Sequence, residues 1–182
     1  MSASTDCLCI ALYARGRESK ELGNIEDKYH WALIAAPKSN PDDQSRSVRF
    51  HAKQTPSAQA PQLVWRYEEQ RLDIGPRNIL LTRIVIGNVL DMGRLRSILA
   101  AIPVRPDVPN WNCVGWVQEA VEAVLRDSEA LNTSVQSWEA VKDKALWYIQ
   151  KKTVEHRFDG RGDFSGQTAA TWDMIEDKEV IP

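Results

Sequence analysis

The hydrophobic pattern of this chain changes its period about halfway along, and that change limits the folds open to it. Between residues 7 and 90 the apolar residues alternate with polar ones or form short continuous runs, as they do in β-strands. After residue 91 they recur every three or four positions, which is typical of amphipathic helices. Strands followed by helices predict an α+β fold with a largely antiparallel sheet.

We expect about five strands in the first half. The segment YHWALIAA (29–36) is almost continuously apolar and ends at Pro37, which is typical of a central strand covered on both faces. The segment VRFHAK (48–53) alternates, so it places His51 on the same face as its charged neighbours. The other three strands are expected at 7–14, 63–72 and 79–90.

The second half predicts three helices, at 91–102, 112–126 and 137–152. Asp91 and Ser137 are suitable N-caps for the first and the third. We expect residues 1–153 to form a single domain and 154–182 to be an irregular tail that packs on it or extends from it. A chain of 182 residues has room for one domain with a substantial core.

Composition excludes some partners and compartments. The net charge is -2, with 25 acidic and 23 basic residues, so no overall field attracts nucleic acid or a membrane surface. Neither a signal peptide nor an apolar run of ~18 residues is present, which predicts a soluble, cytoplasmic protein. Three cysteines are too few for a disulfide framework.

One cysteine stands at the expected start of a helix. In WNCVGWVQEAV (111–121), Asn112 is a suitable N-cap and Cys113 follows it directly. The partial positive charge at a helix N-terminus lowers the pKa of a thiol, which favours a nucleophilic thiolate. The alternative is a small core residue, because Cys113 also belongs to the apolar stripe of this helix. Cys7 and Cys9 share one strand face and are expected in the core.

A cysteine nucleophile needs a base, and two of the three histidines are candidates. His30 and His51 lie inside predicted strands, whereas His156 lies in a polar, basic segment. If the two strands are neighbours, His30 can act as base and His51 can orient it beside Cys113. Aromatic and polar neighbours are candidate substrate-binding residues: Trp31, Trp111, Asn112 and Trp116. No motif predicts a metal site or a cofactor, and the absence of CxxC argues against a thiol redox protein.

The order of these motifs resembles the circularly permuted branch of the papain-like NlpC/P60 superfamily, which includes lecithin retinol acyltransferase and the PPPDE peptidases. YHWALI carries His30, VRFHAK carries His51 and WNCVGWV carries Cys113. The resemblance implies that these residues are the base, the second polar residue and the nucleophile. VGW follows the cysteine where the acyltransferases have an EHF-type sequence, so a phospholipid substrate is not implied.

The whole-chain pattern also resembles the fungal arginine-containing cyclodipeptide synthases of secondary metabolism. That resemblance implies acyl transfer from aminoacyl-tRNA, with a thioester on Cys113 attacked by an amine. A basic segment with interleaved aromatics (142–161) is a candidate RNA-binding surface, although a solvated helix face explains it equally well. Its candidate RNA-binding residues are Lys144, Lys151, Lys152 and Arg157. A papain-like hydrolase (peptidase, isopeptidase or amidase) and a non-catalytic binding module remain the alternatives.

Overall fold

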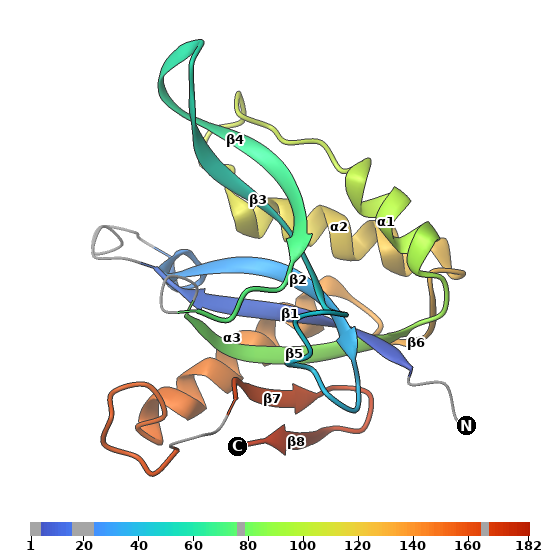
Figure 1. The fold of residues 1–182 in the computed structure, drawn as a ribbon, viewed down its shortest axis with the longest axis vertical. Coiled ribbons are helices and arrows are strands. Elements are labelled where there is room, and N and C mark those ends of the chain that lie inside the picture. The colour runs from blue at the N-terminus through green and yellow to red at the C-terminus, as the bar shows by residue number, and fades with distance from the viewer. Residues whose placement is uncertain (1–4, 16–23, 76–78, 165–167) are drawn as a thin grey trace.

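A computed structural model describes residues 5–15, 24–75, 79–164 and 168–182. Within these residues eight strands form one mixed sheet with the spatial order β4-β3-β2-β1-β5-β7-β8, and β6 pairs with β5 (Figure 1). The strands are β1 (Asp6–Ala14), β2 (Tyr29–Pro37), β3 (Val48–Ser57), β4 (Ala60–Arg71), β5 (Leu80–Val89), β6 (Leu131–Ser134), β7 (Ala170–Asp173) and β8 (Lys178–Ile181). The helices are the 3-10 helix η2 (Ile25–Lys28) and the α-helices α1 (Met92–Ala100), α2 (Cys113–Asp127) and α3 (Trp138–Val154).

The predicted α+β class is confirmed, and the first five strands and the three α-helices lie close to their predicted positions. The side chains of Asp91 and Ser137 accept hydrogen bonds from the first turns of α1 and α3, as predicted for N-caps. The sheet is larger than expected, and it is not wholly antiparallel because β7 runs parallel to β5.

The tail predicted after residue 153 packs on the domain, but it is not irregular throughout. Residues of this segment form β7 and β8, which extend the sheet beyond β5. Each of these two strands is only four residues long, too short to show a clear hydrophobic period. They form because the edge of β5 offers backbone partners from Thr82 to Val85.

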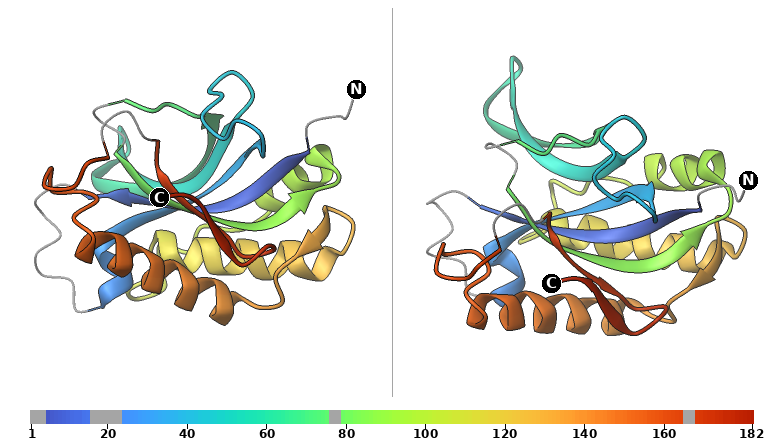
Figure 2. Two further views of the ribbon diagram at one scale, coloured as in Figure 1. Left: turned by 90° about the horizontal axis from the view of Figure 1, so that it is seen from below. Right: turned by 60° about the horizontal axis from the view of Figure 1, so that its bottom comes forward.

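The main core lies between the sheet and the helices. Figure 2 shows α2 and α3 on the same side of the sheet. Inward-facing residues of β1 (Leu8, Ile10 and Leu12) belong to one buried cluster with Val117 and Val121 of α2. The opposite face of β1 and β2 carries a smaller apolar cluster.

The strands β2 and β3 separate at the end of the sheet where the candidate residues lie. They pair only between Leu33–Ala35 and Val48–Phe50. Beyond Phe50, β3 continues with β4 as a hairpin that rises away from the rest of the sheet (Figure 1). The first residues of β2 therefore have β1 as a partner on one side and no pairing with β3 on the other. We call this opening the β2–β3 split.

No helix in the described part of the chain has the length and apolar character needed to cross a membrane.

Candidate active site

Asn112 fixes the start of α2, as predicted. Its backbone is extended, and its side-chain carbonyl accepts a hydrogen bond from the N–H of Val114 at 2.9 Å. Its amide group donates to Asp27 Oδ1 of η2 at 2.7 Å. Because both ends of the amide are engaged, Asn112 positions Cys113 and has little capacity left to bind a substrate.

Cys113 places its sulfur against the β2 edge of the β2–β3 split. The thiol is fully buried, and its Sγ accepts a hydrogen bond from the backbone N–H of Trp31 at 3.5 Å. Nη2 of Arg15, which directly follows β1, donates to the same sulfur at 3.2 Å. The N–H of Trp31 can reach the sulfur because β3 has left β2 at this point. Trp31 directly follows His30, so the thiol lies beside the backbone of the predicted base.

The thiol is not acidic in this resting arrangement. Burial raises the pKa of Cys113 above its ordinary value, and the Trp31 N–H and the Arg15 guanidinium only partly oppose that effect. The prediction of a lowered pKa for Cys113 was therefore wrong. The loss of hydration outweighs both hydrogen bonds, and the resting group is a neutral thiol.

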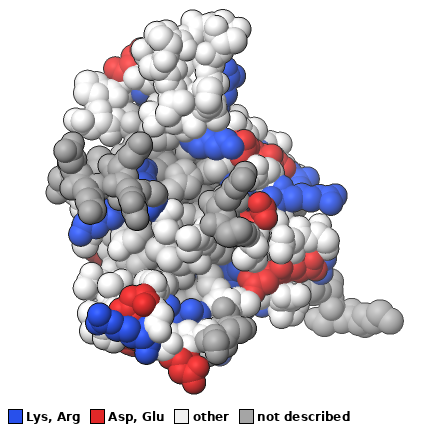
Figure 3. Space-filling view, turned by 60° about the vertical axis from the view of Figure 1, so that its left-hand side comes forward, with Lys and Arg blue, Asp and Glu red and all other residues white. Residues whose placement is uncertain are grey.

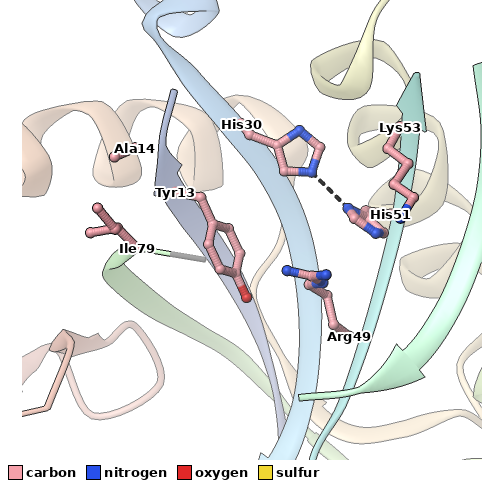
Figure 4. Close-up of a pocket in the computed structure, with 7 residues that line it drawn as sticks. All are labelled: Tyr13, Ala14, His30, Arg49, His51, Lys53 and Ile79. Carbon is pink, nitrogen blue, oxygen red and sulfur yellow. Dashed lines mark hydrogen bonds between the residues drawn. The ribbon is translucent and has the colours of Figure 1, made fainter. Parts of the chain in front are cut away.

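The two histidines meet across the β2–β3 split, as predicted. Nε2 of His30 lies 2.7 Å from Nδ1 of His51 (Figure 4). Nε2 of His51 lies 3.2 Å from Oε1 of Glu68, which stands directly opposite His51 in the β3–β4 hairpin. The three side chains form a continuous hydrogen-bonded chain.

The chain of hydrogen bonds determines the tautomers. A carboxylate only accepts, so Nε2 of His51 carries a proton for Glu68. Neutral His51 then accepts through Nδ1, and Nε2–H of His30 donates to it. This assignment leaves Nδ1 of His30 with a lone pair. An imidazole with this lone pair is in the form that a general base requires.

Both imidazoles are neutral at pH 7. Burial, followed by repulsion from the charge that a protonated His51 would carry, lowers the pKa of His30 to about 3. Burial and then Arg49 lower the pKa of His51 to about 4, although Glu68 acts in the opposite direction. Neutral rings agree with the tautomers that the hydrogen bonds require.

His30 and Cys113 are neighbours but are not joined by a hydrogen bond in the described residues. His30 and Trp31 are consecutive in β2, so their side chains point to opposite faces of the sheet. The side chain of Trp31 packs in the core on the α2 side. The imidazole belongs to the other face, together with Ala32 and Ile34. The structure thus joins the two histidines, and it joins the sulfur to the backbone next to His30, but it does not close a hydrogen-bonded triad.

The predicted substrate-binding tryptophans divide into two groups. Trp31 and Trp116 are fully buried, and their rings pack against Trp138 and Tyr67. These two side chains have no exposed surface, so the structure places them in the core. Trp111 is half-buried and its ring meets Trp65 edge-on, with centroids 5.4 Å apart.

A cavity of about 260 Å³ opens beside the histidine pair. Figure 4 shows lining side chains on β1, β2 and β3 and on Ile79, which directly precedes β5, with helices behind the sheet. The lining residues are Tyr13, Ala14, His30, Arg49, His51, Lys53 and Ile79. Cys113 does not line this cavity, because its sulfur lies on the α2 side of the split.

The predicted RNA-binding residues of α3 contact the end of the chain. Lys152 is buried and forms ion pairs with Glu155 and Glu179. Lys144 forms an ion pair with Asp177 at 3.4 Å, and its Nζ lies 4.8 Å from the Trp172 ring centroid.

The other two predicted RNA-binding residues are also engaged within the chain. Lys151 forms an ion pair with Glu155, and Arg157 donates to the backbone carbonyls of Thr168 and Pro182. On the face drawn in Figure 3, blue and red side chains form small separate groups. Most of the basic residues in this segment therefore contact the C-terminal part of the chain. A helix face exposed only to solvent would not account for these contacts.

Sequence reasoning missed three residues of the site: Arg15, Asp27 and Glu68. Glu68 could have been found from the register of the β3–β4 hairpin, in which it faces His51. The segment 54–62 reads as a long loop because it contains two prolines, so that register was not evident. Arg15 and Asp27 reach the site only through tertiary contacts with α2.

The described residues offer no cluster of three or more His, Cys, Asp or Glu side chains suited to a metal ion.

Comparison with known proteins identifies the family. Residues 5–181 match a family of unknown function, DUF6914. No curated protein and no solved structure matches the chain. Because the match spans nearly the whole sequence, the chain belongs to the family of unknown function DUF6914.

Proposed function

We propose that this protein transfers acyl groups through a thioester on Cys113, with His30 as the base and His51 as the residue that orients it. One observation carries the proposal. The thiol at the start of α2 lies against the backbone beside His30, while the His51–Glu68 chain leaves Nδ1 of His30 unprotonated. The proposal includes a fold of the permuted papain-like type, which the order of the three motifs resembles.

The first half of the reaction forms the acyl-enzyme. Nδ1 of His30 takes the thiol proton as Cys113 Sγ attacks the acyl carbonyl. The bond to the leaving group then breaks, and the His30 imidazolium returns the proton to the departing oxygen. This step requires the His30 ring to turn toward Sγ while it keeps its bond to His51.

Nearby groups are placed to stabilise the charges that develop. Arg15 and the Trp31 N–H donate to the sulfur and so favour the thiolate as it forms. The N–H of Cys113 is at the first position of α2, where a helix offers no internal acceptor. That N–H is suited to the oxyanion of the tetrahedral intermediate.

In the second half of the reaction, the group that attacks the thioester determines whether the protein is a transferase or a hydrolase. An amine that attacks the thioester yields an amide, as the resemblance to arginine-containing cyclodipeptide synthases implies, with aminoacyl-tRNA as donor. Water as the attacking group would make the protein a papain-like hydrolase. A reducing compartment such as the cytoplasm would keep Cys113 in its thiol form.

A non-catalytic binding module is the second candidate. The observation that favours it is the absence of a bond between the His30 ring and the sulfur among the described residues, together with the raised pKa of Cys113.

Intact-protein mass spectrometry separates these candidates. The protein is incubated with arginyl-tRNA and quenched in acid, and we expect an arginyl adduct that hydroxylamine removes. Cys113→Ala should abolish the adduct, and Cys7→Ala, which removes another buried thiol, should keep it. An adduct that survives Cys113→Ala would contradict the proposal. The products then distinguish a transferase, which releases a cyclic dipeptide, from a hydrolase, which releases free arginine.

A further inference from the structure

The short helix η2 lies directly before β2 and contacts three other elements. The carboxylate of Asp27 accepts a hydrogen bond from Nδ2 of Asn112 at 2.7 Å, which joins η2 to the start of α2. The backbone carbonyl of Glu26 accepts from Nε1 of Trp31 in β2 at 2.8 Å. The Glu26 carboxylate pairs with Lys142 of α3 at 3.2 Å. None of the four residues of η2 is buried, so polar contacts rather than core packing hold this helix in place.

Asp27 determines which way the side-chain amide of Asn112 points. An asparagine amide has one donating end and one accepting end of nearly the same size. Because a carboxylate only accepts, Nδ2 must face Asp27, and Oδ1 is directed at the N–H of Val114, which donates to it at 2.9 Å. This second hydrogen bond caps α2, whose first residue is Cys113. The carboxylate therefore acts on the position of the thiol through Asn112.

Two consecutive residues of η2 hold the two groups on either side of the thiol. Asp27 holds Asn112, which directly precedes Cys113 in the chain. Glu26 holds the indole of Trp31, whose backbone N–H donates to Cys113 Sγ at 3.5 Å. The helix η2 therefore sets the distance between the start of α2 and the start of β2, which carry the proposed nucleophile and the proposed base.

We propose that Asp27 is a positioning residue for acyl transfer, which orients the Asn112 amide and so holds Cys113 against β2. The role in acyl transfer rests on the proposed function, whereas the hydrogen bond that orients Asn112 does not. Asp27 takes no part in bond making or proton transfer in this role.

The charge of Asp27 also acts on the thiol, in the direction that opposes catalysis. Burial is the largest cause of the raised pKa of Cys113, and Asp27 adds to it. The Trp31 N–H and the guanidinium of Arg15 act in the opposite direction. A carboxylate that acted only through its charge would slow the reaction by keeping the thiol protonated. Removal of Asp27 therefore has opposite expected effects on the acidity of the thiol and on its rate of acylation, so the two roles can be separated.

The first test removes both the charge and the hydrogen bond with Asp27→Ala. Iodoacetamide labelling between pH 6 and pH 10, followed by peptide mass spectrometry, should show the pKa of Cys113 falling by about half a unit, with unchanged labelling at Cys7 and Cys9. Adduct formation from arginyl-tRNA at pH 7 should nonetheless become about 10-fold slower or more, because the thiol is no longer held in place. Asp143→Asn, which removes an equal charge from an exposed position on α3, should change neither result.

The second test exchanges the two partners. Asn112→Asp alone places two carboxylates opposite each other and should slow adduct formation about as much as Asp27→Ala. The double variant Asp27→Asn/Asn112→Asp restores one donor and one acceptor, and an aspartate is also a good N-cap, so the rate should return to within a few-fold of the wild type. Thermal midpoints show that each variant folds. An unchanged rate in Asp27→Ala, or a double variant no faster than Asn112→Asp, would overturn the proposal.

A third measurement is independent of acyl transfer. The side-chain NH₂ protons of Asn112 should exchange slowly with solvent in the wild type, and at least 10-fold faster in Asp27→Ala, when they are followed by NMR. Equal exchange rates in the two proteins would show that Asp27 does not hold Asn112, and the proposal would fail even if Cys113 is acylated. Faster exchange in a protein that forms no adduct would instead locate the failure in the proposed acyl transfer.

Discussion

Two regions of the molecule gather cations next to aromatic rings, and in one of them the cations also line a cavity. Along α3, Lys144, Lys151 and Lys152 each contact a carboxylate of the C-terminal part of the chain. At the β2–β3 split, Arg49 and Lys53 line a cavity. Basic residues that look alike in sequence thus pair with carboxylates along α3, whereas at the split they also line a cavity, where Lys53 pairs with Glu68.

The two regions also differ in how the backbone is used. On the α3 side, β7 and β8 complete the sheet, so backbone groups are paired with one another. At the split, the pairing of β2 with β3 stops after a few residues, and the N–H of Trp31 turns to the sulfur of Cys113. A local loss of sheet pairing is what makes room for the candidate site.

The largest effect is expected from Cys113→Ala. Removal of the nucleophile should lower the rate of acyl transfer by about 10³-fold or more, because no other group can form the thioester. The thermal midpoint should fall by a few degrees, because the buried sulfur accepts hydrogen bonds from Arg15 and the Trp31 N–H that an alanine side chain cannot accept. Product formation under single-turnover conditions measures the effect. Full activity in this variant would show that the split is not the active site.

The next largest effect is expected from Glu68→Gln, which should lower kcat by about 10²-fold and change KM little. A glutamine amide can donate to Nε2 of His51, which would reverse the direction of the hydrogen bonds and place the proton of His30 on Nδ1. The ¹⁵N shifts of the His30 ring should report that exchange of tautomers. Glu68→Asp serves as a control that retains an accepting carboxylate. A lost rate without any tautomer change would mean that Glu68 is only structural.

Lys152→Met tests the structural role of the α3 region. The variant removes a buried ammonium that lies between Glu155 and Glu179, so the free energy of unfolding should fall by about 2 kcal/mol. Lys144→Gln removes an ammonium that pairs with the exposed Asp177, and it should cost less than about 1 kcal/mol. Urea unfolding measures both. Equal losses of unfolding free energy in the two variants would show that the buried ion pairs of Lys152 stabilise the fold no more than the surface ion pair of Lys144.

Low pH should reduce the free energy of unfolding because of the two histidines at the β2–β3 split. Their pKa values are about 3 and about 4 in the folded protein and near 6.5 when unfolded, so the unfolded chain binds more protons below pH 6.5. The stabilisation is complete above pH 6.5 and is lost as the pH falls toward 4, by about 1.4 kcal/mol per pH unit for each histidine. Urea unfolding at pH 7, 6 and 5 measures the slope. The double variant His30→Gln/His51→Gln should flatten it, and His156→Gln should not.

The sequence by itself was enough for the α+β class and for most of the elements. Long apolar segments such as 29–36 and the caps at Asp91, Asn112 and Ser137 act through nearby residues, so their effect is visible in a linear pattern. The pairing of His30 with His51 was also predictable, because it needs only two neighbouring strands. Short strands such as β7 depend on the edge of β5, which no local pattern reveals.

Only the tertiary structure decided the electrostatics of the site. Burial sets the direction of the pKa shift of Cys113, and burial depends on how α2 packs against the sheet. Arg15 and Glu68 enter through contacts between distant segments. Desolvation and hydrogen bonding arise from what surrounds a side chain in space, whereas the period of a helix or strand arises from the order of residues along the chain.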